Sequence, residues 1–193
     1  MSDNTDARRG DWMQTYSGRR FWPLSPRPED IHLVDIAHSL AHQCRFAGHV
    51  RQHYSVAEHS VRVSWLAGHD DVELAMAALL HDAAEAYVVD VPRPFKRHLV
   101  GYADIEAAVE ECVERRFDLE SGIIRHPSIK HWDEMLLATE ARDLMGGESA
   151  GKWALRAEPL PTVIAPMPTY AARALFLERF AELQARRGAA GAR

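Results

Sequence analysis

The segment of residues 72–87 most constrains the fold of this chain, because its middle is nearly all apolar. A helix that is hydrophobic on most sides lies at the centre of its domain. Yet this segment also carries the adjacent pair His81 and Asp82 and, one helical turn later, Glu85. Buried polar groups cost several kcal/mol unless they are paired or bound to a metal. We therefore interpret the pair as part of a reaction centre rather than as a feature of packing.

Further ligands are needed, because two neighbouring residues cannot complete a coordination sphere. Imidazole nitrogen together with carboxylate oxygen suits Mn, Co, Zn or Fe better than Ca, which prefers cages of oxygen atoms. His59 lies in the first turn of a predicted helix that Ser55 and Glu58 would cap. Asp133 lies in a later helical segment, at the edge of an apolar stripe. For Asp133 the alternative is a charge near a helix N-terminus or a partner for Arg142.

The order of these residues resembles the metal-binding pattern of the HD-domain phosphohydrolases. In that superfamily a His, a His-Asp pair and a distal Asp hold the metal, and here the same order is His59, His81, Asp82 and Asp133. The resemblance covers residues 35–145 and implies that these four side chains bind a divalent ion, namely Mn, Co, Zn, Mg or Fe. With an ion bound, such a site lowers the pKa of a coordinated water from about 16 toward 7 and polarises a phosphoryl oxygen.

The stretch after the pair is similar to the 5′-deoxynucleotidase branch of that superfamily. This branch carries Glu and Asp at the offsets of Glu85 and Asp90, followed by a Pro-x-Pro-x-Lys loop that ends here at Lys96. The resemblance implies acid/base roles, with Glu85 beside the water and Asp90 nearer the leaving group. The alternative for Asp90 is to cap the turn before Pro92, and the alternative for Lys96 is an ordinary surface position.

The pair Arg45 and Phe46 is similar to the Arg-aromatic pair that the same enzymes place before the first metal-binding His. The resemblance implies that Arg45, Phe46 and Lys96 contact the substrate, and guanidinium geometry suits phosphate better than ammonium does. The alternative for Phe46 is a position in the core. The chain departs from the branch at Val89, where Gly is typical before the loop aspartate, and in a proline-rich segment at 148–168.

On this resemblance we expect an enzyme, a metal-dependent phosphohydrolase that acts on (deoxy)nucleotides. The first expectation is a 5′-nucleotidase that releases nucleoside and phosphate. The alternative is a dNTP triphosphohydrolase that releases triphosphate. The cations available to hold a triphosphate are Arg19, Arg20, Arg45, Lys96 and Lys152. A cyclic-nucleotide phosphodiesterase and a nucleotide-binding regulator without turnover are the remaining hypotheses.

Length and cysteine content predict one self-sufficient domain. A chain of 193 residues is long enough to bury a sizeable core, and we expect an HD domain over residues 12–187. A disordered N-terminus (1–11) and a flexible tail (188–193) would flank it. Cys44 and Cys112 fall in predicted helices without CxxC spacing, so a zinc knuckle or a disulfide framework is unsupported.

The net charge and the hydropathy of the chain limit the classes of partner and the locations that we expect for it. The net charge of −5 argues against a nucleic-acid polymer, because neutralising many phosphates needs a basic surface. The N-terminus has no apolar h-region, and no run of about 18 apolar residues occurs, so we expect neither secretion nor membrane insertion. The expectation is a cytoplasmic protein, in a homodimer, with small nucleotides as ligands.

The hydrophobic periodicity predicts an all-α bundle with a small N-terminal β-hairpin, as the resemblance to HD domains also implies. The hairpin strands are expected on either side of Ser17 and Gly18, a turn signal between two aromatic segments. The predicted helices cover residues 34–45, a segment after Ser55, 72–87, 102–119, 129–145 and 170–187. Asp70 and Glu73 would cap the third helix, and Glu114 would face solvent.

Overall fold

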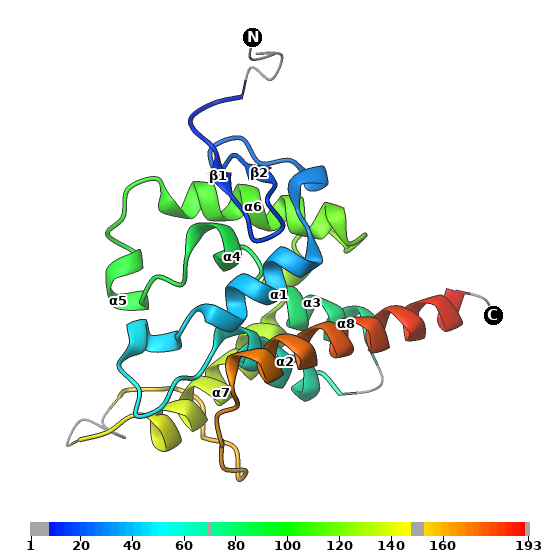
Figure 1. The fold of residues 1–193 in the computed structure, drawn as a ribbon. Coiled ribbons are helices and arrows are strands. Elements are labelled where there is room, and N and C mark those ends of the chain that lie inside the picture. The colour runs from blue at the N-terminus through cyan, green and yellow to red at the C-terminus, as the bar shows by residue number, and fades with distance from the viewer. Residues whose placement is uncertain (1–7, 69–70, 148–152, 192–193) are drawn as a thin grey trace.

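Helices make up most of the structure, a computed structural model that describes residues 8–68, 71–147 and 153–191 (Figure 1). The elements are β1 (Met13–Gln14), β2 (Arg20–Phe21), η1 (Pro28–Asp30), α1 (Leu33–His42), η2 (Arg45–Gly48), α2 (Val56–Leu66), α3 (Val72–Leu80), α4 (Glu85–Val88), α5 (Arg93–Lys96), α6 (Tyr102–Arg116), η3 (Ile123–Arg125), α7 (Pro127–Leu144) and α8 (Thr169–Gly191). The predicted all-α bundle with an N-terminal hairpin is confirmed. Among the described residues, none of the helices combines the length and the apolar character needed to cross a bilayer.

The hairpin is fixed to α1 and packs against α4. Its two strands are antiparallel, with Met13 opposite Phe21. In the turn between them, the backbone N–H and the hydroxyl of Ser17 donate to the buried Asp35 carboxylate of α1, at 2.6 and 2.9 Å. The buried Phe21 ring stacks on the Tyr87 ring of α4, with centroids 4.1 Å apart. The hairpin therefore supports the short helix that follows the His-Asp pair.

Helix α3 lies at the centre of the bundle, as its apolar sequence predicts. All residues from Ala75 to Leu80 are buried, and α2 and α8 pack against this helix (Figure 1). The buried Arg179 of α8 donates to the hydroxyl and the carbonyl of Ser64 in α2, at 3.0 and 3.1 Å. The same Ser64 hydroxyl donates to the Ala75 carbonyl of α3 at 2.8 Å, which holds α2 beside α3 so that side chains from the two helices can meet.

Helix α1 ends at His42, earlier than predicted. The backbone of Gln43 and Cys44 is extended, and Cys44 forms an antiparallel bridge with Ser55. Cys44 is therefore not helical, whereas Cys112 lies in α6 as predicted. Hydrophobic periodicity could not reveal this end, because the backbone leaves the helix to pair with a later segment of the chain.

Helix α3 ends at Leu80, whereas the sequence predicts one helix through to Tyr87. Residues 81–84 form turns that lead into α4. At this break the Nδ1 of His81 bonds the Ala78 carbonyl at 2.8 Å. In a continuing helix that carbonyl would accept the N–H of the residue after His81. A side chain thus competes with the backbone, and the apolar pattern does not report it.

Two charged residues differ from their predicted roles. Asp71 caps α3, since its carboxylate accepts the N–H of Leu74 at 2.9 Å. Asp70, the predicted cap, lies outside the described residues. Glu114 is buried rather than solvated, because its carboxylate accepts two backbone N–H groups that follow α6, at 2.9 and 3.2 Å. The charged face of α6 is therefore partly structural.

The chain ends also differ from expectation. Helix α8 continues to Gly191, into the predicted tail. At the other end, the Arg8 guanidinium pairs with Asp30 and lies 4.2 Å from the centroid of the Trp22 ring. Residue 8 therefore contacts the domain, although the sequence predicts disorder there; residues 1–7 lie outside the described part.

The proline-rich segment after α7 is fastened to that helix over its described part, residues 153–168. Arg142 of α7 donates to the carbonyls of Leu160 and Thr162, at 2.6 and 2.7 Å. The remainder of the segment, with Lys152, lies outside the described residues. The segment is thus an irregular strap along α7, in agreement with the predicted lack of periodicity.

Candidate metal centre

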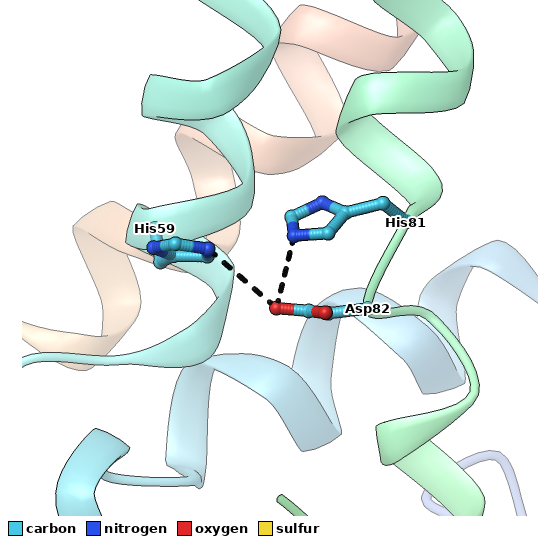
Figure 2. Close-up of side chains that lie close together, drawn as sticks. All are labelled: His59, His81 and Asp82. Carbon is cyan, nitrogen blue, oxygen red and sulfur yellow. Dashed lines mark ion pairs between the residues drawn. The ribbon is translucent and has the colours of Figure 1, made fainter. Parts of the chain in front are cut away.

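Two histidines and an aspartate converge between α2 and the turn after α3. His59 lies on α2, which Ser55 caps as predicted by accepting the N–H of Glu58 at 3.1 Å. Figure 2 shows the imidazoles of His59 and His81 turned toward Asp82, whose Oδ2 lies 3.6 and 3.2 Å from their Nε2 atoms. One ligand atom from each of the three residues lies within 4.8 Å of the others. A single metal ion can bridge this spacing.

Hydrogen bonds at Nδ1 orient both imidazoles. His81 Nδ1 lies 2.8 Å from the Ala78 carbonyl, which can only accept, so Nδ1 carries the proton. His59 Nδ1 lies 2.7 Å from Oε1 of Glu140. Each Nε2 is buried and makes no hydrogen bond with any described residue. Buried nitrogens of this kind beside a carboxylate fit the donor set of a divalent ion.

Asp133, the fourth predicted ligand, borders this group from α7. Its Oδ1 lies 3.3 Å from Nε2 of His59, and its Oδ2 accepts from the Arg93 guanidinium at 2.5 Å. The alternative partner considered from the sequence, Arg142, pairs instead with Asp143 at 2.7 Å. The Asp133 carboxylate therefore borders the group through His59, but it is not among the three residues whose ligand atoms all lie within 4.8 Å of one another.

Glu140 connects the metal centre to Arg45, and the sequence reasoning missed it. The side chain is fully buried on α7, and its Oε2 accepts from Nε and Nη2 of Arg45 at 3.1 and 3.0 Å. A carboxylate that accepts from the second ring nitrogen of a ligand His fixes the ring and raises its basicity. One signal was available, because Glu140 falls seven residues, or about two helical turns, after Asp133 within an apolar stretch.

The surroundings of His59 favour a positive charge at Nε2. Burial and the charge of Arg45 lower the pKa of this imidazole, but the carboxylates of Glu140 and Asp133 outweigh them and raise it to about 9. A divalent ion coordinated at Nε2 would take the place of that proton.

Arg45 lies in η2, directly after the extended segment that follows α1. Two of its nitrogens bond Glu140, while Nη1 lies 3.7 Å from Oδ2 of Asp82. The next residue, Phe46, has a positive φ of 57°. Its half-buried ring lies 5.4 Å from the Arg45 guanidinium and 5.8 Å from the ring of Trp153. The predicted substrate-binding pair therefore adjoins the metal centre. The Phe46 ring also lies near Trp153 of the proline-rich segment that follows α7.

The predicted acid/base residues and Lys96 lie in or between the two short helices α4 and α5. Glu85 begins α4 and is buried, and its Oε2 has no hydrogen-bond partner among the described residues. Asp90 lies between α4 and α5 and is half-buried. The ammonium of Lys96 lies 2.5 Å from Oε1 of Glu106 and 5.4 Å from the ring of Tyr102. Lys96 thus already has a carboxylate partner on α6, in place of the phosphate that the resemblance implies.

Opposite pKa shifts separate the carboxylates of the site. Burial raises the pKa of Asp82, but the charges of His81 and His59 outweigh it and hold this pKa far below its ordinary value. Burial and the neighbouring charge of Asp82 raise the pKa of Glu85 well above its ordinary value. Burial also raises the pKa of Asp90. The pKa values of Asp133 and Glu140 are lowered like that of Asp82, although burial opposes this, because His59 and, for Glu140, Arg45 lie beside them. Such a division, with some carboxylates ionised and others able to hold a proton, is typical of sites that combine binding with proton transfer.

Two curated proteins are similar to this chain over most of their lengths. The uncharacterized protein YfdR of Escherichia coli (strain K12) is 36% identical over 176 residues, which cover 89% of this chain and 95% of that protein. The uncharacterized protein RCAP_rcc00048 of Rhodobacter capsulatus is 33% identical over 163 residues, which cover 79% of this chain and 83% of that protein. No family model matches the chain. Neither name states an activity.

Proposed function

The chain belongs to the family that includes YfdR of Escherichia coli, and we propose that it is a metal-dependent phosphohydrolase of the HD type that acts on nucleotides. Its substrate is a (deoxy)nucleoside 5′-monophosphate, and its products are nucleoside and inorganic phosphate. One observation carries the proposal. The buried Nε2 atoms of His59 and His81 face Asp82 and have no hydrogen-bond partner among the described residues.

Four side chains, which we call the ligand cluster, would hold the ion: His59, His81, Asp82 and Asp133. Glu140 and a backbone carbonyl keep the two imidazoles in the orientation that presents Nε2. Four protein ligands would leave coordination positions open for water and substrate, which is typical of catalytic rather than structural sites. A divalent ion bound there supplies a Lewis acid and lowers the pKa of water.

The chain's own carboxylates can move the protons of the reaction. Water adds to phosphorus, the bond between phosphorus and the 5′ oxygen breaks, and that oxygen leaves with a proton. The raised pKa of Glu85 suits a group that takes a proton from water near neutral pH. Asp90, whose pKa is also raised, would give a proton to the departing oxygen. Both roles agree with those that the resemblance implies.

The described cations favour one phosphate group over three. Arg45 keeps Nη1 beside the ligand cluster and can meet a phosphate oxygen there. Among the other cations considered for a triphosphate, Lys96 is paired with Glu106, and Arg20 lies over an aromatic ring of the hairpin. Lys152 lies outside the described residues. Arg19 lies at an exposed position. We therefore propose the 5′-nucleotidase, for which the one phosphate contact of Arg45 suffices, ahead of the triphosphohydrolase.

The test is hydrolysis by the protein loaded in turn with Mn, Co, Zn, Mg or Fe. Deoxy- and ribonucleoside monophosphates, dNTPs and cyclic nucleotides are supplied separately, and nucleoside, phosphate and triphosphate are resolved by chromatography. We expect nucleoside and phosphate from the monophosphates, no turnover in Asp82→Asn, and parental turnover in Asp11→Asn, which changes an exposed aspartate. Release of triphosphate would replace the proposed substrate class. No turnover of any nucleotide by the metal-loaded protein would overturn the proposed activity.

A further inference from the structure

The backbone that carries Glu85 and Asp90 is held by the side chain of Gln43. Gln43 is the residue that follows α1, and its backbone is extended. Its Nε2 donates to the Glu85 carbonyl at 2.9 Å, and its Oε1 accepts the N–H of Asp90 at 3.0 Å. One amide therefore bridges both ends of residues 85–90, which we call the acid/base segment.

The Gln43 amide can make this bridge in one orientation only. The Glu85 carbonyl can only accept and the Asp90 N–H can only donate, so nitrogen must face the first and oxygen the second. Ser39, one turn earlier on α1, adds support, because its hydroxyl accepts from Gln43 Nε2 at 3.1 Å and donates to the Ala86 carbonyl at 3.0 Å. A residue without both a donor and an acceptor at position 43 removes the bridge.

The acid/base segment contains a strained residue. Val89 has φ of 71° and ψ of 144°, a region that side chains other than glycine rarely adopt. Its side chain is 59% exposed, so burial in the core does not hold it there. Hydrogen bonds hold it instead, because its N–H donates to the Glu85 carbonyl at 2.9 Å and its carbonyl accepts from the Tyr102 hydroxyl at 2.7 Å. The bond from the Asp90 N–H to Gln43 completes this restraint.

We propose that Gln43 is a positioning residue, which holds the strained backbone of Val89 and so keeps the carboxylates of Glu85 and Asp90 at a fixed separation. Strained backbone persists only where its surroundings hold it. Without the bridge, Val89 relaxes to negative φ and the Asp90 peptide moves with it. Proton transfer depends on this placement, since an error of about 1 Å can cost roughly 10²-fold in rate. The effect of Gln43 on catalysis rests on the proposed function, whereas its hydrogen bonds to the segment are observed in the structure.

The test compares Gln43→Ala, Val89→Gly and the double variant, with Gln184→Ala at an exposed position of α8 as control. In Gln43→Ala we expect kcat to fall by at least about tenfold, while KM and bound metal change by less than about twofold. Val89→Gly alone should keep kcat within about threefold, because glycine adopts positive φ without strain. In the double variant kcat should recover by at least about threefold over Gln43→Ala, since no strain remains to displace the segment.

Two results would overturn the inference: parental kcat in Gln43→Ala, or a double variant no faster than Gln43→Ala. A second readout needs no substrate, namely amide hydrogen exchange of peptides that cover residues 85–95. We expect exchange there to be at least about tenfold faster in Gln43→Ala and unchanged in Gln184→Ala. If the parent protein hydrolyses no nucleotide, the proposed function fails. Amide hydrogen exchange then still tests whether Gln43 restrains the acid/base segment, because unchanged exchange in Gln43→Ala would reject that restraint.

Discussion

The acid/base segment begins three residues after Asp82 of the ligand cluster, but the protein holds the two groups by different means. His59 and Asp133 lie on helices of 11 and 18 residues, and buried hydrogen bonds orient the imidazoles. The acid/base segment contains a helix of 4 residues and the exposed, strained Val89. Packed helices place the first group, whereas hydrogen bonds from the side chains of Ser39, Gln43 and Tyr102 to the backbone place the second. We therefore expect changes in the second region to reduce turnover while metal binding persists.

The largest effect is expected for the loss of a metal ligand from the ligand cluster. His81→Ala should remove both the bound metal and the activity, because the remaining ligands become uncompensated buried polar groups. Elemental analysis of the purified variant measures the metal, and His131→Ala, at an exposed position of α7, is the control. Full metal occupancy in His81→Ala would remove His81 from the ligand cluster.

Glu85→Gln tests the role of the acid/base segment. We expect kcat to fall by roughly 10²-fold or more while the metal and the fold are retained, since a positioned acid/base group contributes about this much. Glu111→Gln, at an exposed position of α6, should behave as the parent. Equal kcat in Glu85→Gln and the parent would make Glu85 part of the scaffold and end the functional distinction between the two regions.

Glu140→Gln tests how much the carboxylate that accepts from His59 contributes to metal binding by the ligand cluster. The amide still accepts from His59 Nδ1, but its charge is lost, so the ligand imidazole becomes less basic and the buried Arg45 loses its ion pair. We expect metal affinity to weaken by roughly 10- to 100-fold. Competition with a chelating dye measures it, with Glu178→Gln on the exposed face of α8 as control. Unchanged affinity would show that packing alone orients His59.

Arg45 adjoins the ligand cluster, since it bonds Glu140, the partner of His59, and faces Asp82. Arg45→Ala should lower kcat/KM by roughly 10- to 100-fold, because a charge-assisted contact to phosphate is lost. Arg45→Lys keeps the charge but cannot bond Glu140 through two nitrogens, and should recover only part of the loss. The assays are made at saturating metal, because the Glu140 contact ties Arg45 to the orientation of His59. Parental efficiency in Arg45→Ala would exclude a contact with substrate.

The smallest effect is expected for Arg93→Ala. The Arg93 side chain is 60% exposed, and its ion pair with Asp133 is the kind that contributes about 0–1 kcal/mol. Metal affinity should therefore change by less than about fivefold, and the thermal midpoint should stay within about 2 °C of the parent. Arg97→Ala, an exposed neighbour, is the control. A loss of affinity above about tenfold would mean that Arg93 of α5 supports the ligand cluster.

The sequence by itself determined the fold class, the hairpin and the central position of α3. It also singled out His59, His81 and Asp82, which the structure brings together. These features depend on local patterns, namely apolar periodicity, capping residues and turn signals, and each pattern records whether a position is buried or where an element begins. A polar pair at the end of an apolar run stands out for the same reason.

Only the tertiary structure decided which partners the polar groups take. At the end of α3 the His81 ring bonds the Ala78 carbonyl, and the backbone of Glu85 and Asp90 is bonded by Gln43, which lies 42 and 47 residues away in the sequence. Glu140 reaches His59 across 81 residues. A side-chain hydrogen bond needs its donor and acceptor within about 3 Å of each other at a suitable angle. Local periodicity does not contain that information, because it arises only when helices distant in sequence are packed together.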